Sequence, residues 1–218
     1  MFGFITYNTA VVLLGVTLLG AAAGLVGGYA LLKRRALLGD ALAHAALPGL
    51  GIAFLLVGQR SLPVLLLGAL GSGLAGIGVL AALRRFSRIK PDAAIAIVLG
   101  VFFGVGVVLL SVIPRLPGGS PAGLEAFILG KTAGMLWNDA LLIAAMAGTV
   151  LLVVLALYKE FQLATFDPEF AGVQGWPTFL LDLALQMLVA GGVIVGLPAV
   201  GGLLVAALVG IPPAGARF

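Results

Sequence analysis

The sequence of 218 residues contains no cysteine, a single histidine and few charged side chains. Without cysteine the chain has no disulfide framework and no thiolate metal site. Charged residues make up only 9% of the sequence, against roughly a quarter in a soluble domain. Hydrophobic residues make up 62%, which is more apolar surface than a soluble fold of this length removes from water. This composition excludes a soluble enzyme and an intrinsically disordered chain.

Several motifs of nucleotide and ion chemistry are also absent. The sequence has no Gly-x-x-x-x-Gly-Lys-Ser/Thr phosphate loop and no His-Glu-x-x-His motif, so it does not hydrolyse nucleotide by that loop. It has no arginine-rich span of a voltage sensor and no potassium-selectivity sequence. The net charge of +4 comes from basic residues between apolar runs, which indicates a membrane protein rather than a nucleic-acid-binding one.

Apolar runs long enough to cross a membrane recur along the chain, since a crossing helix needs about 20 residues. We expect spans at about 9–32, 36–57, 62–83, 93–113 and 140–158. The region of about 177–214 is too long for one span, and its glycines and Pro198 predict a sixth helix, a break and a short seventh segment. The sequence therefore predicts an all-α, polytopic transmembrane helix bundle with about 6–7 membrane segments, in a single domain over 1–218.

The distribution of lysine and arginine predicts the orientation of the bundle. With the N-terminus outside, the cytoplasmic loops hold eight basic residues: Lys33, Arg34, Arg35, Arg84, Arg85, Arg88, Lys90 and Lys159. The outside loops then hold three, with Arg217 left aside: Arg60, Arg115 and Lys131. We therefore expect the N-terminus outside.

Small residues at a spacing of four predict close contacts between helices. Gly68, Ser72 and Gly76 share one face of the third predicted span, and Gly100 and Gly104 share a face of the fourth. In a membrane, small residues let helix backbones approach closely. We expect both groups to pack against neighbouring helices.

Asp40 and His44 form the sharpest candidate for a metal site. Their spacing of four places both side chains on one helix face. His44 lies nine residues after Arg35, about 14 Å along a helix, near the middle of the membrane. Ionisable groups at this depth usually face an interior path. Carboxylate and imidazole suit zinc, manganese or iron(II), although two ligands do not complete a coordination shell.

Pro48 and Gly49 follow this pair and predict a break in the helix. Proline has no N–H group, so the carbonyl of His44 loses its helical partner. Broken helices near the membrane midplane are typical of transporters, because they expose backbone groups to a substrate. The alternative is a structural Asp–His hydrogen bond inside the bundle, with Pro48 as a kink.

Two further groups of residues near the predicted inner surface are candidates for a functional or structural role. Phe166, Asp167, Pro168, Glu169 and Phe170 predict a short surface helix, because Asp167 suits the N-cap and Pro168 the first helical position. This helix is either an ordinary interfacial helix or a docking element for a cytoplasmic partner. Asp182 and Gln186 share a helix face, for which we favour a structural role.

Residues 35–49, RALLGDALAHAALPG, resemble the most specific motif of the permeases of zinc, manganese and iron ABC importers. Residues 90–111, 166–171 and 198–217 are similar to three further stretches of this family, so the resemblance extends over nearly the whole chain. The sequence departs from the family pattern at Pro198, Pro213 and Gly215, which makes the last segment less typical. Family members continue with further helices beyond the position of Phe218, so the resemblance implies that C-terminal helices are missing here.

The resemblance implies a multi-pass permease in a prokaryotic cell membrane, in contact with lipid and forming a homodimer or a pseudo-dimer. It implies a cytoplasmic ATP-binding subunit and an extracytoplasmic metal-binding protein as partners, and no nucleic acid. Asp40 and His44 match the positions that contact the transported metal, and residues 166–170 match the ATPase-coupling loop. By this resemblance the chain is not an enzyme and holds no permanent cofactor, only a transported zinc, manganese or iron ion.

Two other classes of protein fit the same residues. A stand-alone cation channel or secondary transporter would use the Asp40 and His44 path without an ATPase. A structural membrane subunit would use the pair only as a buried hydrogen bond. The sequence does not choose among zinc, manganese and iron, because aspartate and histidine serve all three.

Overall fold

The computed structural model describes residues 7–57, 62–115 and 129–216, and the regular structure in these ranges is entirely helical. Six of its helices are long and apolar enough to cross a membrane, so the predicted all-α polytopic bundle is confirmed. The elements follow in the order α1 (Tyr7–Leu32), α2 (Leu38–Val57), α3 (Leu62–Phe86), α4 (Pro91–Val112), η1 (Ile113–Arg115), η2 (Thr132–Gly134), α6 (Trp137–Ala156), α7 (Tyr158–Phe166), α8 (Pro168–Val173), α9 (Thr178–Val200) and α10 (Gly202–Gly215).

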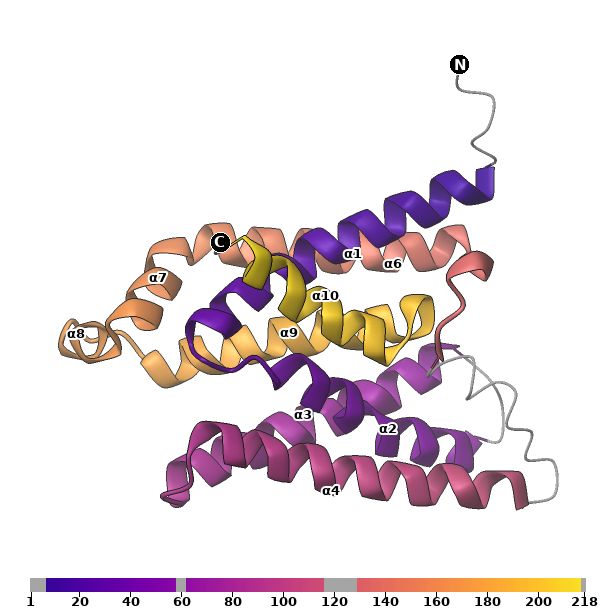
Figure 1. Cartoon of the computed structure of the whole chain (residues 1–218), viewed down its shortest axis with the longest axis horizontal. Coiled ribbons are helices and arrows are strands. Elements are labelled where there is room, and N and C mark those ends of the chain that lie inside the picture. Colours follow the sequence, from indigo (N-terminus) through magenta and orange to yellow (C-terminus); the bar gives the residue numbers. More distant parts are fainter. Residues whose placement is uncertain (1–6, 58–61, 116–128, 217–218) are drawn as a thin grey trace.

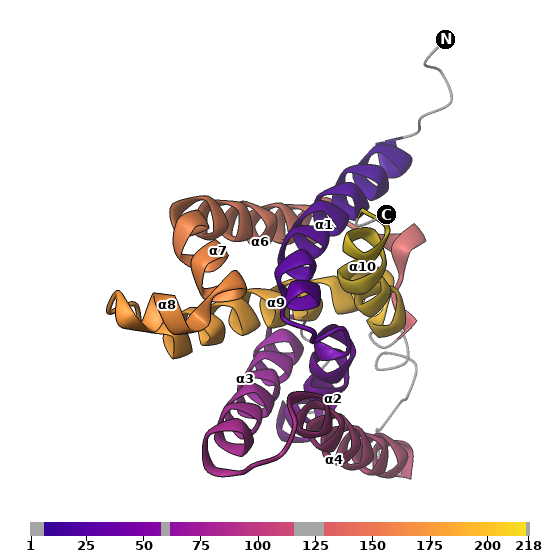
Figure 2. The ribbon, with the colours of Figure 1, turned by 60° about the vertical axis from the view of Figure 1, so that its left-hand side comes forward.

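The helices form two groups with α9 between them. In both views of the ribbon, α2, α3 and α4 lie together on one side, and α1, α6 and α10 lie on the other (Figures 1 and 2). Helix α2 packs against α3 and α4, and α1 packs against α10 and α6. Helix α9 contacts both groups, and it and α2 are the most extensively buried of the spans.

The connection after α6 differs from expectation. The sequence from Lys159 to about Trp176 reads as a polar loop apart from the short helix predicted after Asp167, whereas the structure has two helices there, α7 and α8, of which only α8 was predicted. Phe161 and Ala164 are buried, and they anchor α7 against the bundle. Tertiary burial of two residues on one face thus stabilises a helix that the polar sequence did not suggest.

The small residues of α3 pack as predicted. A Cβ atom on Gly68 would overlap the backbone of Gly49 on α2, and a Cβ on Gly76 would press on Ala45. The hydroxyl of Ser72 donates a hydrogen bond to the Ala45 carbonyl, which joins α2 and α3. For Gly100 and Gly104 the prediction is wrong within the described chain, because a Cβ on either would meet open space.

The expected break at Pro48 and Gly49 is not present, since α2 continues from Leu38 to Val57 with Pro48 inside it. The reason is packing: residues 45–51 are all buried, and Gly49 lies directly on the α3 backbone. Ser72 of α3 also donates a hydrogen bond to the carbonyl of Ala45, next to the His44 carbonyl that lacks its helical partner, and membrane helices tolerate proline where neighbouring helices hold them in this way. Pro48 is therefore an interior proline in a continuous helix.

The break predicted within 177–214 is confirmed at Gly201. Helix α9 ends at Val200, Gly201 has a φ of 87°, and α10 begins at Gly202. This positive φ is readily adopted by glycine, which has no Cβ. Helix α10 then runs back alongside α1, where Gly27 lies against the backbone of Val209.

Candidate functional site

The structure brings Asp40 and His44 together on α2. The Nε2 atom of His44 lies 3.3 Å from Oδ1 of Asp40. The side chains of Asp40 and His44 are 41% and 33% exposed, respectively, whereas every other residue from Leu38 to Gly51 is buried. The pair is thus the open strip of the otherwise buried part of α2. His44 is six residues into α2, about 9 Å along the helix from Leu38.

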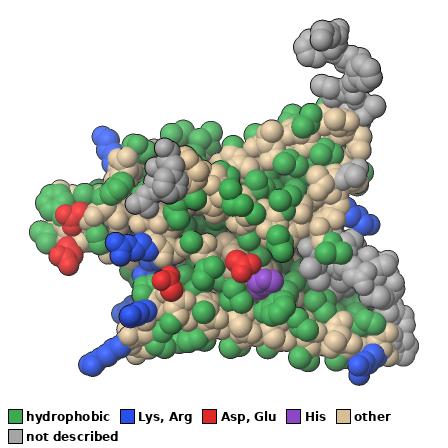
Figure 3. All heavy atoms as spheres, viewed as in Figure 1, with side chains coloured by type: hydrophobic (Ala, Val, Ile, Leu, Met, Phe, Trp, Pro, Cys, Tyr) green, Lys and Arg blue, Asp and Glu red, His purple; other side chains and the backbone are tan. Residues whose placement is uncertain are grey.

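The surroundings of this pair are apolar. The ring of Phe103 on α4 meets the imidazole of His44 edge-on, with 4.7 Å between ring centroids. Figure 3 shows the histidine and an adjacent acidic side chain in the middle of one face, among hydrophobic side chains and away from the basic residues at the ends. A carboxylate with an imidazole in such surroundings attracts a cation, since few other polar groups compete.

The pair offers one carboxylate and one imidazole for a metal ion. Within residues 7–57, 62–115 and 129–216, no group of three or more His, Cys, Asp or Glu side chains has the arrangement of a metal site. Zinc takes about four ligands and manganese more. Any further His, Cys, Asp or Glu ligand for an ion at this pair therefore comes either from outside the described part of this chain or from a second polypeptide.

The segment Phe166–Phe170 forms a turn and the start of α8. The carboxylate of Asp167 accepts a hydrogen bond of 2.9 Å from the backbone N–H of Phe170, so the predicted N-cap is confirmed. All five residues of the segment are exposed, and Ala171 is fully buried beneath them. Helix α8 lies at one extreme end of the molecule (Figure 1). The segment is therefore held in place by the buried Ala171 and projects from that end of the bundle.

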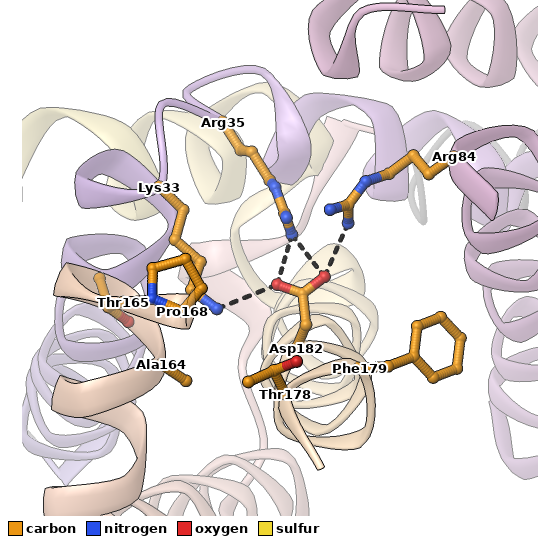
Figure 4. Close-up of a pocket in the computed structure, with 9 residues that line it drawn as sticks. All are labelled: Lys33, Arg35, Arg84, Ala164, Thr165, Pro168, Thr178, Phe179 and Asp182. Carbon is orange, nitrogen blue, oxygen red and sulfur yellow. Dashed lines mark hydrogen bonds and ion pairs between the residues drawn. The ribbon is translucent and has the colours of Figure 1, made fainter. Parts of the chain in front are cut away.

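A third cluster centres on Asp182 of α9. Its carboxylate accepts hydrogen bonds from Nη1 of Arg35 at 2.7 and 2.9 Å and from Nη1 of Arg84 at 2.7 Å. It also accepts from Nζ of Lys33 at 3.1 Å and from Gln186 at 2.9 Å. In Figure 4 the three basic side chains converge on this carboxylate. One carboxylate thus joins α1, the α1–α2 turn, α3 and α9.

Sequence reasoning placed Asp182 and Gln186 on one face, as observed, and missed the three basic partners. A usable signal was present. Asp40 and Asp182 are the two acidic residues inside the predicted spans, and an intramembrane carboxylate normally pairs with a basic group. Lys33, Arg35 and Arg84 all end predicted spans on the same side as Asp182. The pairing follows from topology rather than from local spacing.

The basic residues predicted to face the cytoplasm gather at one end of the bundle. The α1–α2 turn, the α3–α4 connection and α7 with α8 all lie at this end in Figure 1. Arg115 and Lys131 belong to the connections at the opposite end, whereas Arg60 and Arg217 lie outside the described residues. The charge asymmetry is therefore a property of the folded molecule as well as of the sequence.

Comparison with known proteins identifies similar chains. A sequence model described as the ABC 3 transport family matches residues 6–218. The chain is 44% identical to the manganese transport system membrane protein MntC of Bacillus subtilis over 97% of its own length. It is 46% identical to the zinc transport system membrane protein TroC of Treponema pallidum over 98% of its length. PsaBC from Streptococcus pneumoniae, solved in complex with Fab, has a TM-score of 0.76 and 25% identity, covering 94% of this chain.

The matched proteins are longer than this chain. The chain spans 48% of the Bacillus protein, 72% of the Treponema protein and 70% of the Streptococcus chain. The comparisons therefore bear on the family of the chain rather than on the activity of a whole transporter.

Proposed function

Because this chain belongs to the ABC 3 transport family, we propose that it is the membrane permease subunit of an ABC importer for a divalent transition-metal ion: zinc, manganese or iron. The observation that carries the proposal is the Asp40–His44 pair, the only open strip between Leu38 and Gly51 of α2. An anionic oxygen and a neutral nitrogen donor 3.3 Å apart suit a borderline divalent cation. The relatives named for manganese and zinc transport support this substrate class.

The ion path lies between two copies of the chain in this proposal. Asp40 and His44 supply two ligands per chain, so a two-fold axis beside α2 brings together two carboxylates and two imidazoles. Four protein ligands are the number that zinc takes, and manganese adds water or carbonyl oxygens. Gly100, exposed one turn from Phe103, gives α4 a smooth surface on which a second helix can pack. The homodimer therefore completes the metal shell.

The segment Phe166–Phe170 is the contact for a separate ATP-binding subunit. Phe166 and Phe170 are 71% and 49% exposed, although large apolar side chains at a polar end of the molecule are normally covered. The N-cap of Asp167 fixes the start of α8, and α8 packs on both α7 and α9. A displacement of α8 by the ATP-binding subunit is therefore transmitted to the membrane-spanning helices through α7 and α9.

The orientation follows the charge asymmetry, with the N-terminus outside and α7 and α8 in the cytoplasm. An extracytoplasmic metal-binding protein delivers the ion to the opposite end. ATP hydrolysis in the partner subunit supplies the energy, so the chain itself is not an enzyme and holds no resident cofactor. The ion is cargo: it binds at Asp40 and His44 and leaves.

Metal accumulation in cells tests this proposal. The chain, in the full-length form in which it occurs, is expressed with its ATP-binding subunit and binding protein, and zinc, manganese and iron are measured by elemental analysis. We expect His44→Ala to abolish accumulation of one metal while the protein still inserts into the membrane. Asn138→Ala, at an exposed polar position at the start of α6, is the control and keeps normal accumulation. Normal accumulation by His44→Ala would refute the assignment.

A stand-alone channel or secondary transporter is the rival. It predicts metal uptake that persists when the ATP-binding subunit is inactivated by a substitution in its own phosphate loop. The importer predicts complete dependence on that subunit, together with its copurification through the α8 segment.

A further inference from the structure

A cavity of about 430 Å³ lies beside the Asp182 cluster, at the end of the bundle that carries α7 and α8. Neither Asp40 nor His44 lines it, and it has no part in the proposed ion path. Phe179 forms an apolar wall, and the polar lining comes from Lys33, Arg35, Arg84, Thr165, Thr178 and Asp182. In Figure 4, Thr165 and Pro168 lie on the Lys33 side of the cavity and Phe179 lies on the opposite side.

The cavity carries an excess of positive charge. Three basic groups face one carboxylate, which leaves a formal charge of +2 among these side chains. Arg35 and Asp182 are 7% and 8% exposed, so this charge is poorly screened by water. Buried charge without a counter-ion is unfavourable, so the lining favours a bound anion.

Hydrogen-bond donors remain for such an anion. Arg35 and Arg84 both bond Asp182 through Nη1, and no described residue accepts from their Nε or Nη2 atoms. The Oγ1 atom of Thr165 is buried and has no hydrogen-bond partner among the described residues. Planar guanidinium groups and a hydroxyl are the donors that bind phosphate oxygens. Asp182 does not oppose this binding, because it fixes the guanidinium groups while neutralising only one of the three cations.

The apolar wall distinguishes a lipid from a free anion. Phe179 is 48% exposed, and its ring lies 6.0 Å from the guanidinium carbon of Arg85. It sits in the first turn of α9, where a membrane helix meets the headgroup region and aromatic side chains are enriched. A phosphate in the cavity would therefore have hydrocarbon beside it at Phe179.

We propose that this cavity binds the phosphate group of an anionic phospholipid, with its acyl chains running along α9 past Phe179. Basic pockets between membrane helices on the cytoplasmic side bind such headgroups, and the assignment of this end to the cytoplasm rests on the proposed orientation. The bound lipid would neutralise the cluster that joins α1, α3 and α9. Lipid binding is thus a separate property from metal transport.

Binding to the purified full-length protein in neutral detergent tests the proposal, independently of orientation and transport. Fluorescent phosphatidylglycerol is titrated into the protein, and unlabelled phosphatidylglycerol, phosphatidylcholine and inorganic phosphate compete. We expect displacement by phosphatidylglycerol alone. Equal displacement by phosphatidylcholine would overturn the anion site. Displacement by inorganic phosphate at millimolar concentration would overturn the lipid and leave a site for the free ion.

Three variants locate the site. Arg84→Gln should weaken phosphatidylglycerol binding about tenfold, because a charge-assisted phosphate contact is lost. Arg88→Gln removes the same charge from an exposed position at the same end and should leave affinity unchanged. Thr165→Val should weaken binding about threefold without lowering thermal stability, because the hydroxyl has no partner in the protein. Equal losses for Arg84→Gln and Arg88→Gln, or no loss for Thr165→Val, would overturn the site.

Discussion

Gly49 of α2 and Gly68 of α3 lie with their backbones in direct contact, so that a Cβ atom on either glycine would overlap the carbonyl group of the other. This contact lies five residues after His44 and fixes α2 against α3. The position of the Asp40–His44 strip therefore depends on these two glycines, which take no part in metal binding themselves. Membrane helices associate by such packing, since burial from water supplies no force between them.

Gly68→Ala should lower the stability of the protein, because the added methyl group has no space between α2 and α3. The expected loss is about 1–3 kcal/mol, as for overpacking of a core. Thermal unfolding in detergent, followed by tryptophan fluorescence, measures it. Gly71→Ala is the control on the same helix, where a Cβ would meet open space. Equal melting temperatures for the two variants would contradict this packing.

Asp40→Asn should reduce metal accumulation by more than about tenfold, because loss of a ligand exceeds the 10- to 100-fold effect of losing a supporting group. The amide keeps the shape of the side chain, so insertion should be normal. Asp92→Asn removes an exposed carboxylate from the first turn of α4 and should transport normally. Elemental analysis of cells provides the measurement, and equal accumulation by both variants would remove Asp40 from the path.

Leu37→Cys should cross-link two copies of the chain if the proposed two-fold axis passes Asp40. Leu37 is 50% exposed and lies one turn before Asp40, and the chain has no native cysteine to interfere. A short bifunctional thiol reagent in native membranes should give a dimer band on a denaturing gel. Leu152→Cys, on an exposed position of α6, should give no such band. A dimer band only with Leu152→Cys would place the interface on the other side of the molecule.

Asp167→Ala should weaken α8 and its contact with the ATP-binding subunit. The substitution removes the bond to the Phe170 N–H, and loss of such an N-cap costs about 1 kcal/mol. Asp167→Ser retains a capping oxygen and should keep copurification of the partner near the wild-type level. Pull-down of the partner and ATP-dependent uptake are the two readouts. If serine were as damaging as alanine, the carboxylate would have a role other than capping.

Asp182→Asn should destabilise the chain by about 3 kcal/mol or more, because three basic groups lose their shared counter-ion in a buried position. The loss should be larger than for Asp92→Asn, whose carboxylate is exposed. Thermal unfolding in neutral detergent measures both. Adding phosphatidylglycerol should restore part of the stability of Asp182→Asn, as expected for an anion that binds the same cations.

The spans were predictable because every helix that crosses the hydrocarbon core needs an apolar run of sufficient length. The packing face formed by Gly68, Ser72 and Gly76 was predictable because residues spaced by four lie on the same side of a helix. The helix at Phe161 was not predictable, since its stability comes from burial against distant parts of the chain. The continuity of α2 through Pro48 has the same origin, because Gly49 and Ser72 form contacts that exist only in the folded bundle.

The candidate site was only partly predictable. The spacing of Asp40 and His44 defined the pair, and the distance between them agrees with it. Helical spacing said nothing about Phe103, which approaches from another helix. The basic partners of Asp182 are separated from it by 98 to 149 positions in the sequence, so no local pattern connects them.

This separation also sets an order of events during synthesis. Lys33 and Arg35 leave the ribosome 149 and 147 residues before Asp182, and Arg84 leaves it 98 residues before. A nascent chain that has inserted its first four spans therefore presents basic groups whose acidic partner has not been made. Insertion of α9 is the step that neutralises them and joins the early helices to the late ones. Until that helix is in place, the early helices form an incomplete intermediate of the kind that larger chains pass through as they fold.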